Sequence, residues 1–108
     1  MAKLERVIHE DLDHLLSRIE QGILDGSISA SLEDSSDYTV GDARCCHRVF
    51  ERYSMIGENR VSMSIMLFQS GDSPVYLSAV TSGGSQAVLF KINTWGEEAF
   101  LEKLIDIL

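Results

Sequence analysis

Three alternating segments joined by short turns constrain the fold of this chain more than any other feature of its sequence. Residues 43–55, 60–69 and 75–82 alternate their side chains as strands do, and the turns between them fall at 57–59 and 71–74. Consecutive strands with such short connections pair antiparallel. The sequence therefore predicts an antiparallel meander, and the core side of its middle strand should carry Val61, Met63, Ile65 and Leu67.

Further strands are predicted on both sides of this meander. Residues 3–9 fit an edge strand, and residues 27–32 fit a half-buried strand. Residues 86–93 fit a last strand, entered through a hairpin turn at Gly83-Gly84. Residues 33–42 are rich in acids and serines, so we expect a loop there. The sheet should therefore hold about five or six strands.

Two amphipathic segments predict one helix near each end of the chain. Residues 11–24 and residues 96–108 both place large apolar side chains at helical spacing. Thr94 and Glu97 match the capping box of a helix start. Both apolar stripes need a sheet face to cover.

These elements fit one α+β domain over residues 1–108, with an antiparallel sheet and both helices packed on one of its faces. The order of elements favours the helix-grip arrangement, in which a curved antiparallel sheet wraps a C-terminal helix. A chain of 108 residues has room for a single domain of this kind.

Charge and hydropathy limit the class of protein. No apolar stretch approaches the roughly 18 residues that a membrane-spanning helix needs. The first residues lack the apolar segment and cleavage site of a signal peptide. The net charge of −8 argues against a protein that holds nucleic acid through its phosphates. We therefore expect a cytoplasmic protein that binds neither nucleic acid nor membranes.

The side chains that carry chemistry lack the spacing of known motifs. Cys45 and Cys46 are adjacent, so on a strand they point to opposite faces, and neither a relaxed disulfide nor a zinc motif fits them. We expect two free thiols, with a redox role as the alternative. Cys45, His47 and Glu51 share one strand face and form a candidate nucleophilic set, but an ordinary half-buried histidine is the simpler expectation. No metal or other cofactor is predicted, and an enzyme is the least favoured class.

Arginines gather on the other face of the same strand. Arg44, Arg48 and Arg52 alternate along it, and Arg60 follows after the turn. Guanidinium groups offer paired donors to carboxylates and phosphates, so this row is the candidate anion site. The alternative is a solvated face whose arginines pair with acids of the chain, such as Glu33, Asp34 or Glu51.

The middle strand is apolar on both of its sides. A two-layer fold leaves one sheet face without a helix, and Phe50, Met66 and Phe68 are the candidates for apolar side chains on that face. We therefore expect an interaction module that forms a homodimer through this face or through a sheet edge. The alternative is a domain that binds a small ligand in a pocket between the sheet and the C-terminal helix, with arginines near its mouth.

Four stretches of the chain resemble a known family. They are residues 26–34, 48–53, 81–87 and 91–101, with the sequences GSISASLED, RVFERY, TSGGSQA and KINTWGEEAFL. The family consists of small bacterial proteins that are known only as a domain of unknown function, and the resemblance covers nearly the whole chain. It implies a bacterial, cytoplasmic origin and assigns no activity, ligand or site residue.

Overall fold

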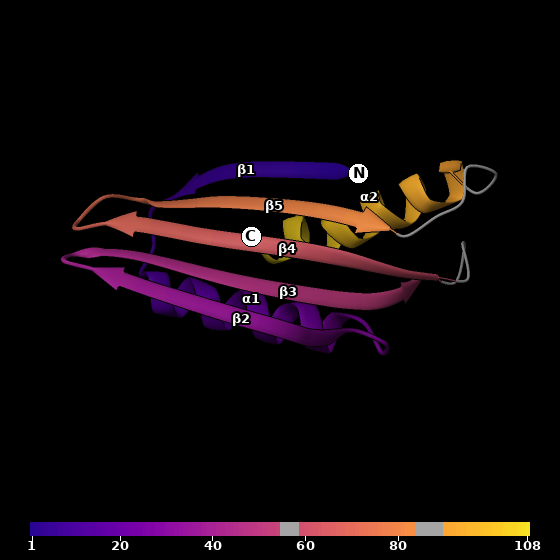
Figure 1. Cartoon of the computed structure of the whole chain (residues 1–108), viewed down its shortest axis with the longest axis horizontal. Coiled ribbons are helices and arrows are strands. Elements are labelled where there is room, and N and C mark those ends of the chain that lie inside the picture. Colours follow the sequence, from indigo (N-terminus) through magenta and orange to yellow (C-terminus); the bar gives the residue numbers. More distant parts are fainter. Residues whose placement is uncertain (55–58, 84–89) are drawn as a thin grey trace.

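The computed structural model describes residues 1–54, 59–83 and 90–108. A five-stranded antiparallel sheet and two helices make up this part of the chain, which confirms the predicted α+β class (Figure 1). In chain order the elements are β1 (Ala2–Ile8), α1 (Leu12–Gly26), β2 (Ser31–Val40), β3 (Ala43–Ser54), β4 (Asn59–Ser70), β5 (Val75–Gly83) and α2 (Phe90–Ile107).

The strands lie in the order β1-β5-β4-β3-β2, and every neighbouring pair is antiparallel. The last four strands form the predicted meander, whereas β1 pairs with β5 at the far edge. Helix α1 therefore carries the chain from one edge of the sheet to the other. The two edge strands, β1 and β2, are the elements that precede and follow this helix.

Both helices pack on the same face of the sheet, as predicted, and they lie behind it in Figure 1. Asp11 caps α1, because its carboxylate accepts a hydrogen bond of 2.9 Å from the backbone N–H of His14. The predicted core face of β4 is buried under the helices. The largest fully buried side chains of this core include Leu15, Ile19, Phe50, Met63, Ile65, Leu67, Phe100 and Leu104.

Phe50 corrects one prediction about the sheet faces. It was expected on the uncovered face, but it pairs with Met63 across β3 and β4, and its exposed fraction is 0%. Because side chains alternate along β3, the three arginines of the row that lie on β3 share the covered face with Phe50. In the described part of the chain, no helix covers the other face of the sheet, which we call the open face.

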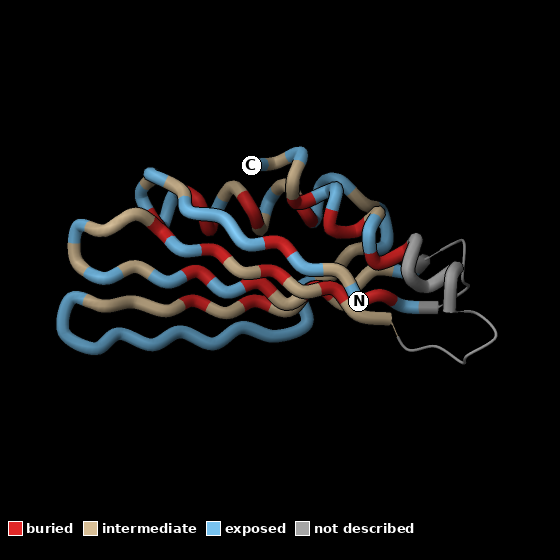
Figure 2. Tube along the Cα trace, turned by 90° about the horizontal axis from the view of Figure 1, so that it is seen from above, coloured by how far each residue is buried: buried red, intermediate tan, exposed pale blue. Residues whose placement is uncertain are grey.

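Three predicted boundaries were wrong. Residues 27–30, expected to begin a half-buried strand, precede β2, which starts at Ser31. The expected loop at residues 33–42 is mostly strand β2, which is exposed along nearly its whole length (Figure 2). Residues 90–93, expected in a last strand, belong to α2. Thr94 lies inside that helix and not at its start, so the proposed capping box does not begin it. The rest of that strand and most of the Gly83-Gly84 turn lie outside the described residues.

The two hairpins β2–β3 and β4–β5 turn side by side at one end of the sheet. Gly41 and Gly71 adopt φ values of 60° and 56°, a conformation that side chains with a Cβ rarely adopt. The backbone N–H of Gly71 donates to the carbonyl of Asp42 at 3.0 Å and so links the two turns. Neither described helix is long and apolar enough to cross a membrane.

Candidate functional site: the open sheet face

One row of paired residues crosses the open face through all five strands. The register pairs Tyr38 with Cys45, Cys45 with Phe68, Phe68 with Tyr76, and Tyr76 with Val7. Because strands lie about 4.8 Å apart, this row extends for about 19 Å across the sheet. It arises from five separate segments, so no local motif marks it in the sequence.

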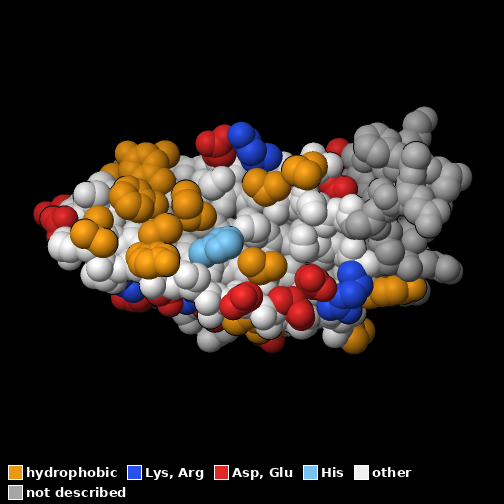
Figure 3. Space-filling view, viewed as in Figure 1, with side chains coloured by type: hydrophobic (Ala, Val, Ile, Leu, Met, Phe, Trp, Pro, Cys, Tyr) orange, Lys and Arg blue, Asp and Glu red, His pale blue; other side chains and the backbone are white. Residues whose placement is uncertain are grey.

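Val40 and Met66 flank this row and complete what we call the apolar patch, whose members are Val7, Tyr38, Val40, Met66, Phe68 and Tyr76. Their exposed fractions run from 38% for Phe68 to 75% for Val40. In the space-filling view, hydrophobic side chains gather at the end of the open face where the hairpins turn (Figure 3). Met66 and Phe68 are thus on the face predicted for them.

Two shallow depressions lie on either side of Met66. One, of about 380 Å³, is lined by Ser36, Tyr38, Cys45, His47, Ser64 and Met66. The other, of about 260 Å³, lies toward β1, and its lining includes Val7, Met66 and Tyr76. The patch therefore has both projecting side chains and hollows beside them.

A polar pair borders the first depression. The imidazole Nε2 of His47 and the hydroxyl Oγ of Ser64 are joined by a hydrogen bond of 2.6 Å. Glu51 instead accepts a hydrogen bond of 2.8 Å from Arg60. The candidate set of Cys45, His47 and Glu51 shares the open face, but no described hydrogen bond connects its members to one another.

The two cysteines face opposite sides of the sheet. Both are free thiols; Cys45 is half-buried on the open face and Cys46 is buried on the covered face. Burial raises the pKa of the Cys46 thiol, and the nearby carboxylate of Asp37 adds to the increase. Cys45 is therefore the cysteine that is accessible to reagents and partners.

The candidate anion row is divided between the two faces of the sheet. Arg44, Arg48 and Arg52 point toward the helices, whereas Arg60 pairs in register with Tyr53 and lies on the open face. The four guanidinium groups therefore do not form one continuous surface. Each guanidinium group has its own partners within the chain.

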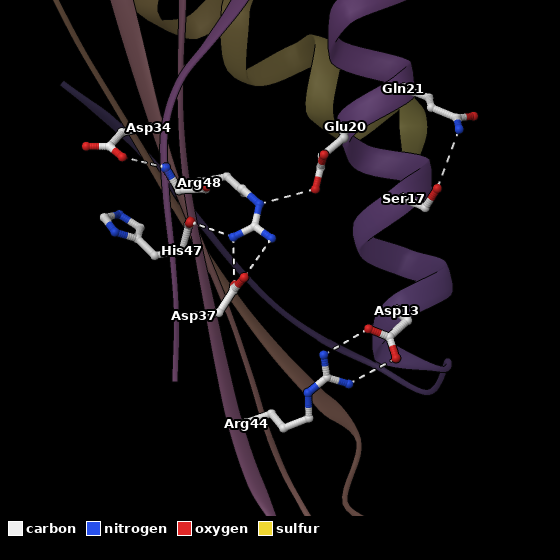
Figure 4. Close-up of polar contacts among 10 residues, drawn as sticks. Asp13, Ser17, Glu20, Gln21, Asp34, Asp37, Arg44, His47 and Arg48 are labelled. Atoms are coloured by element: carbon white, nitrogen blue, oxygen red, sulfur yellow. Dashed lines mark hydrogen bonds and ion pairs between the residues drawn. The ribbon is translucent and has the colours of Figure 1, made fainter. Parts of the chain in front are cut away.

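Carboxylates of the chain already occupy two of these arginines (Figure 4). Arg44 makes a two-pronged pair with Asp13 of α1, at 2.8 and 3.0 Å. Buried Arg48 donates to Asp37 of β2 at 2.7 and 3.2 Å and to Glu20 of α1 at 3.2 Å. These hydrogen bonds hold the pKa values of Asp13 and Asp37 below their usual range.

Arg52 and Arg60 have different surroundings. Arg52 donates to Ser27 Oγ at 3.1 Å and lies over the ring of Phe100, and burial lowers its pKa. Arg60 pairs with Glu51 at 2.8 Å and with Glu33 at 4.0 Å, as the solvated alternative predicted for these two acids. Asp34, the third acid of that prediction, accepts a hydrogen bond from the backbone N–H of Ser35.

Sequence reasoning missed three of the acidic partners: Asp13, Glu20 and Asp37. The first two lie on α1, far from Arg44 and Arg48 along the chain, and no sequence pattern indicates that these segments come into contact. The third was assigned to a loop, although its strand pairing places it opposite Cys46 and beside Arg48. Residues 33–37 are all acids and serines, so no alternation of apolar and polar side chains marks this part of the strand in the sequence.

Comparison with known proteins identifies the family of this chain. The family model described as "Family of unknown function (DUF6054)" matches residues 1–108. The chain belongs to DUF6054. No curated protein matches the chain. The description of this family assigns it no function.

Proposed function

We propose that this DUF6054 protein is an interaction module that forms a homodimer through the apolar patch on its open sheet face. The observation that carries the proposal is the in-register row from Tyr38 to Val7, which places large apolar side chains in water on four of the five strands and the half-buried thiol of Cys45 on β3. Exposed apolar surface costs about 25 cal/mol per Å², so covering it with a second copy is favourable.

The size of the patch fits this role. With about 150–250 Å² for a large side chain, the exposed fractions of the patch give roughly 500–800 Å² of mostly apolar surface. A standard interface buries about 800 Å² on each partner, and about 65% of its core is apolar. The patch therefore supplies about the apolar area that one side of such an interface needs.

Shape and charge support a two-fold arrangement of identical patches. In a symmetric dimer one surface has to complement itself, so it needs projections as well as hollows. Tyr76 lines one of the two depressions that flank Met66, and Phe68 is exposed between Cys45 and Tyr76 in the row. Three acidic residues lie in α1 and four in α2, on the layer that would face away from the partner.

We further propose that the dimer belongs to the cytoplasm of a bacterium. Two features of the chain support this compartment: an accessible free thiol at Cys45 and a second free thiol at Cys46. Thiols persist in reducing compartments and are oxidised outside them.

The test is the oligomeric state of a charge variant and of its matched control. Tyr76→Lys places a charge in the patch, and Ile28→Lys makes a similar change at an apolar side chain that is fully exposed outside the patch. We expect light scattering at micromolar concentration to give a dimer for the wild type and for Ile28→Lys, and a monomer for Tyr76→Lys. A wild-type monomer, or a dimer that persists in Tyr76→Lys, would contradict the proposal.

Cys45 provides a second readout, because it lies in the row while Cys46 lies on the covered face. A maleimide should modify Cys45 slowly in the wild-type dimer and quickly in Tyr76→Lys, and the Cys45→Ser variant should react slowly in either background. Equal rates with and without Tyr76→Lys would place the interface elsewhere.

A further inference from the structure

Three side chains with soft donor atoms line the same depression on the open face. Cys45 offers a thiol, His47 an imidazole and Met66 a thioether, and all three border the hollow of about 380 Å³. Cys45 and His47 are alternate residues of β3, and Met66 lies directly opposite His47 on β4. The pairing of two strands thus brings together donors that no sequence motif joins.

The sheet geometry places these donors within reach of one ion. Directly opposite residues have Cβ atoms about 4.5–5.5 Å apart, which is the separation expected for His47 and Met66. Alternate residues of one strand are about 6.5–7 Å apart, which is the separation expected for Cys45 and His47. The methionine side chain has three rotatable bonds, so its sulfur can move toward the other two donors.

We infer that Cys45, His47 and Met66 form a binding site for a soft monovalent metal ion, Cu(I). Thiolate and thioether sulfur select Cu(I), and imidazole is also a good ligand for copper. Harder ions prefer carboxylate oxygens, and the described residues that line this depression include no Asp or Glu. On binding, the Cys45 thiol loses its proton to solvent, and no electron is transferred.

Ser64 acts as a positioning residue for His47 in this site. Its hydroxyl forms the 2.6 Å hydrogen bond with His47 Nε2. When Nε2 carries the proton and donates to Ser64 Oγ, Nδ1 keeps its lone pair for the metal. Histidine ligands usually donate their second N–H to a fixed partner in this way, and loss of that partner weakens metal affinity about 10–100-fold.

The experiment offers the protein Cu(I) as its bicinchoninate complex without oxygen and follows the loss of the chelator's colour. We expect one Cu(I) per chain in the wild type, no transfer to Cys45→Ser, and at least about tenfold weaker binding by His47→Asn, Met66→Leu and Ser64→Ala. The matched controls are Cys46→Ala, on the covered face, and His14→Asn, on α1, and both should bind as the wild type does.

Three results would overturn the inference. The first is a wild type that removes no Cu(I) from the chelator. The second is unchanged binding by both His47→Asn and Met66→Leu, which would reveal an isolated thiol. The third is loss of binding in Cys46→Ala, with its fold verified by circular dichroism.

The site lies within one chain, although its depression shares Tyr38 and Met66 with the apolar patch, and Tyr76→Lys separates the two ideas. Tyr76 does not line this depression. The variant should therefore still bind one Cu(I) per chain as a monomer, and its failure to bind would overturn a site contained in one chain. A wild type that binds Cu(I) but is monomeric would contradict only the proposed function.

Discussion

The guanidinium carbon of Arg52 lies 4.8 Å from the centroid of the Phe100 ring. This contact joins β3 to α2, and the hydrogen bond from Arg52 to Ser27 extends it to the end of α1. Burial lowers the pKa of Arg52, and the aromatic face attracts the charge that is partly removed from water. One side chain of β3 therefore contacts both α2 and the residue that follows α1.

A double-mutant cycle should detect this contact. We expect Arg52→Met and Phe100→Leu each to lower the free energy of unfolding, and the pair to lower it by less than the sum, with a coupling of about 0.5–1 kcal/mol. The measurement is urea unfolding of the four proteins. Arg60→Met combined with Phe100→Leu is the control, because Arg60 lies on the open face, and this pair should be additive. Additive effects for Arg52 and Phe100 would contradict the contact.

The pair of Arg48 and Asp37 should make stability depend on pH. The pKa of Asp37 is lowered from its ordinary value of 3.8, chiefly by the hydrogen bond from Arg48. The unfolded state then binds more protons than the folded state, so this contribution is present above that ordinary value and disappears as the pH falls through the folded pKa.

We therefore expect Asp37→Asn to be less stable than the wild type at neutral pH and to lose less stability on acidification below about pH 4. Unfolding free energies over an acid pH series provide the measurement. Asp34→Asn is the matched control on the same strand, and it should retain the wild-type slope. An unchanged slope in Asp37→Asn would show that the pair adds no stability.

The close packing of the two helices predicts that one substitution will change stability in opposite directions in two backgrounds. A Cβ atom at Gly22 of α1 would lie 2.6 Å from Cδ1 of Ile107 at the end of α2. Alanine improves helix propensity by about 0.8–1.0 kcal/mol over glycine, but overpacking costs about 1–3 kcal/mol. We expect Gly22→Ala to destabilise the wild type and to stabilise the Ile107→Ala variant.

The midpoints of thermal unfolding of these variants test whether Gly22→Ala changes stability in opposite directions in the two backgrounds. Stabilisation by Gly22→Ala in both backgrounds would mean that Ile107 moves aside freely. Gly26→Ala is a useful control, because a Cβ there meets no other atom within 4 Å.

The C-terminal helix should be essential to the core. Leu104 is fully buried, whereas Leu108, just past the helix, is 37% exposed. We expect Leu104→Ala to lower the free energy of unfolding by about 2–5 kcal/mol, and Leu108→Ala to lower it by less than about 1 kcal/mol. Chemical denaturation of both variants tests this, and equal effects would mean that α2 contributes little to the core.

The sequence predicted the buried side of a strand correctly where one of its two alternating sets of side chains is entirely apolar. Val61, Met63, Ile65 and Leu67 were predicted on the core face of β4 and are buried there. Alternation along β3 also grouped the residues correctly, but it does not tell which group the helices cover. Arginines are usually exposed, so the group that contains Phe50 was assigned to the wrong face.

The candidate site shows a second limit of the sequence. Met66 and Phe68 were found because β4 is apolar on both sides, but Tyr38 was hidden in a presumed loop. The strand β2 there is polar and almost wholly exposed, so its extended form depends on backbone pairing with β3 and not on an apolar pattern. Contacts between distant segments, such as Asp13 with Arg44, depend on the tertiary structure alone.

The pairing of Ala2 with Thr81 sets the order in which the chain can fold during synthesis. The hairpins from β2 to β5 connect neighbouring segments and can form as they leave the ribosome, whereas β1 has to wait, with nothing to pair with, until nearly the whole sheet exists. During that interval the outer edge of β5 has free backbone donors and acceptors, which another nascent chain can bind. The arrival of the first strand is therefore the step that covers this edge of β5.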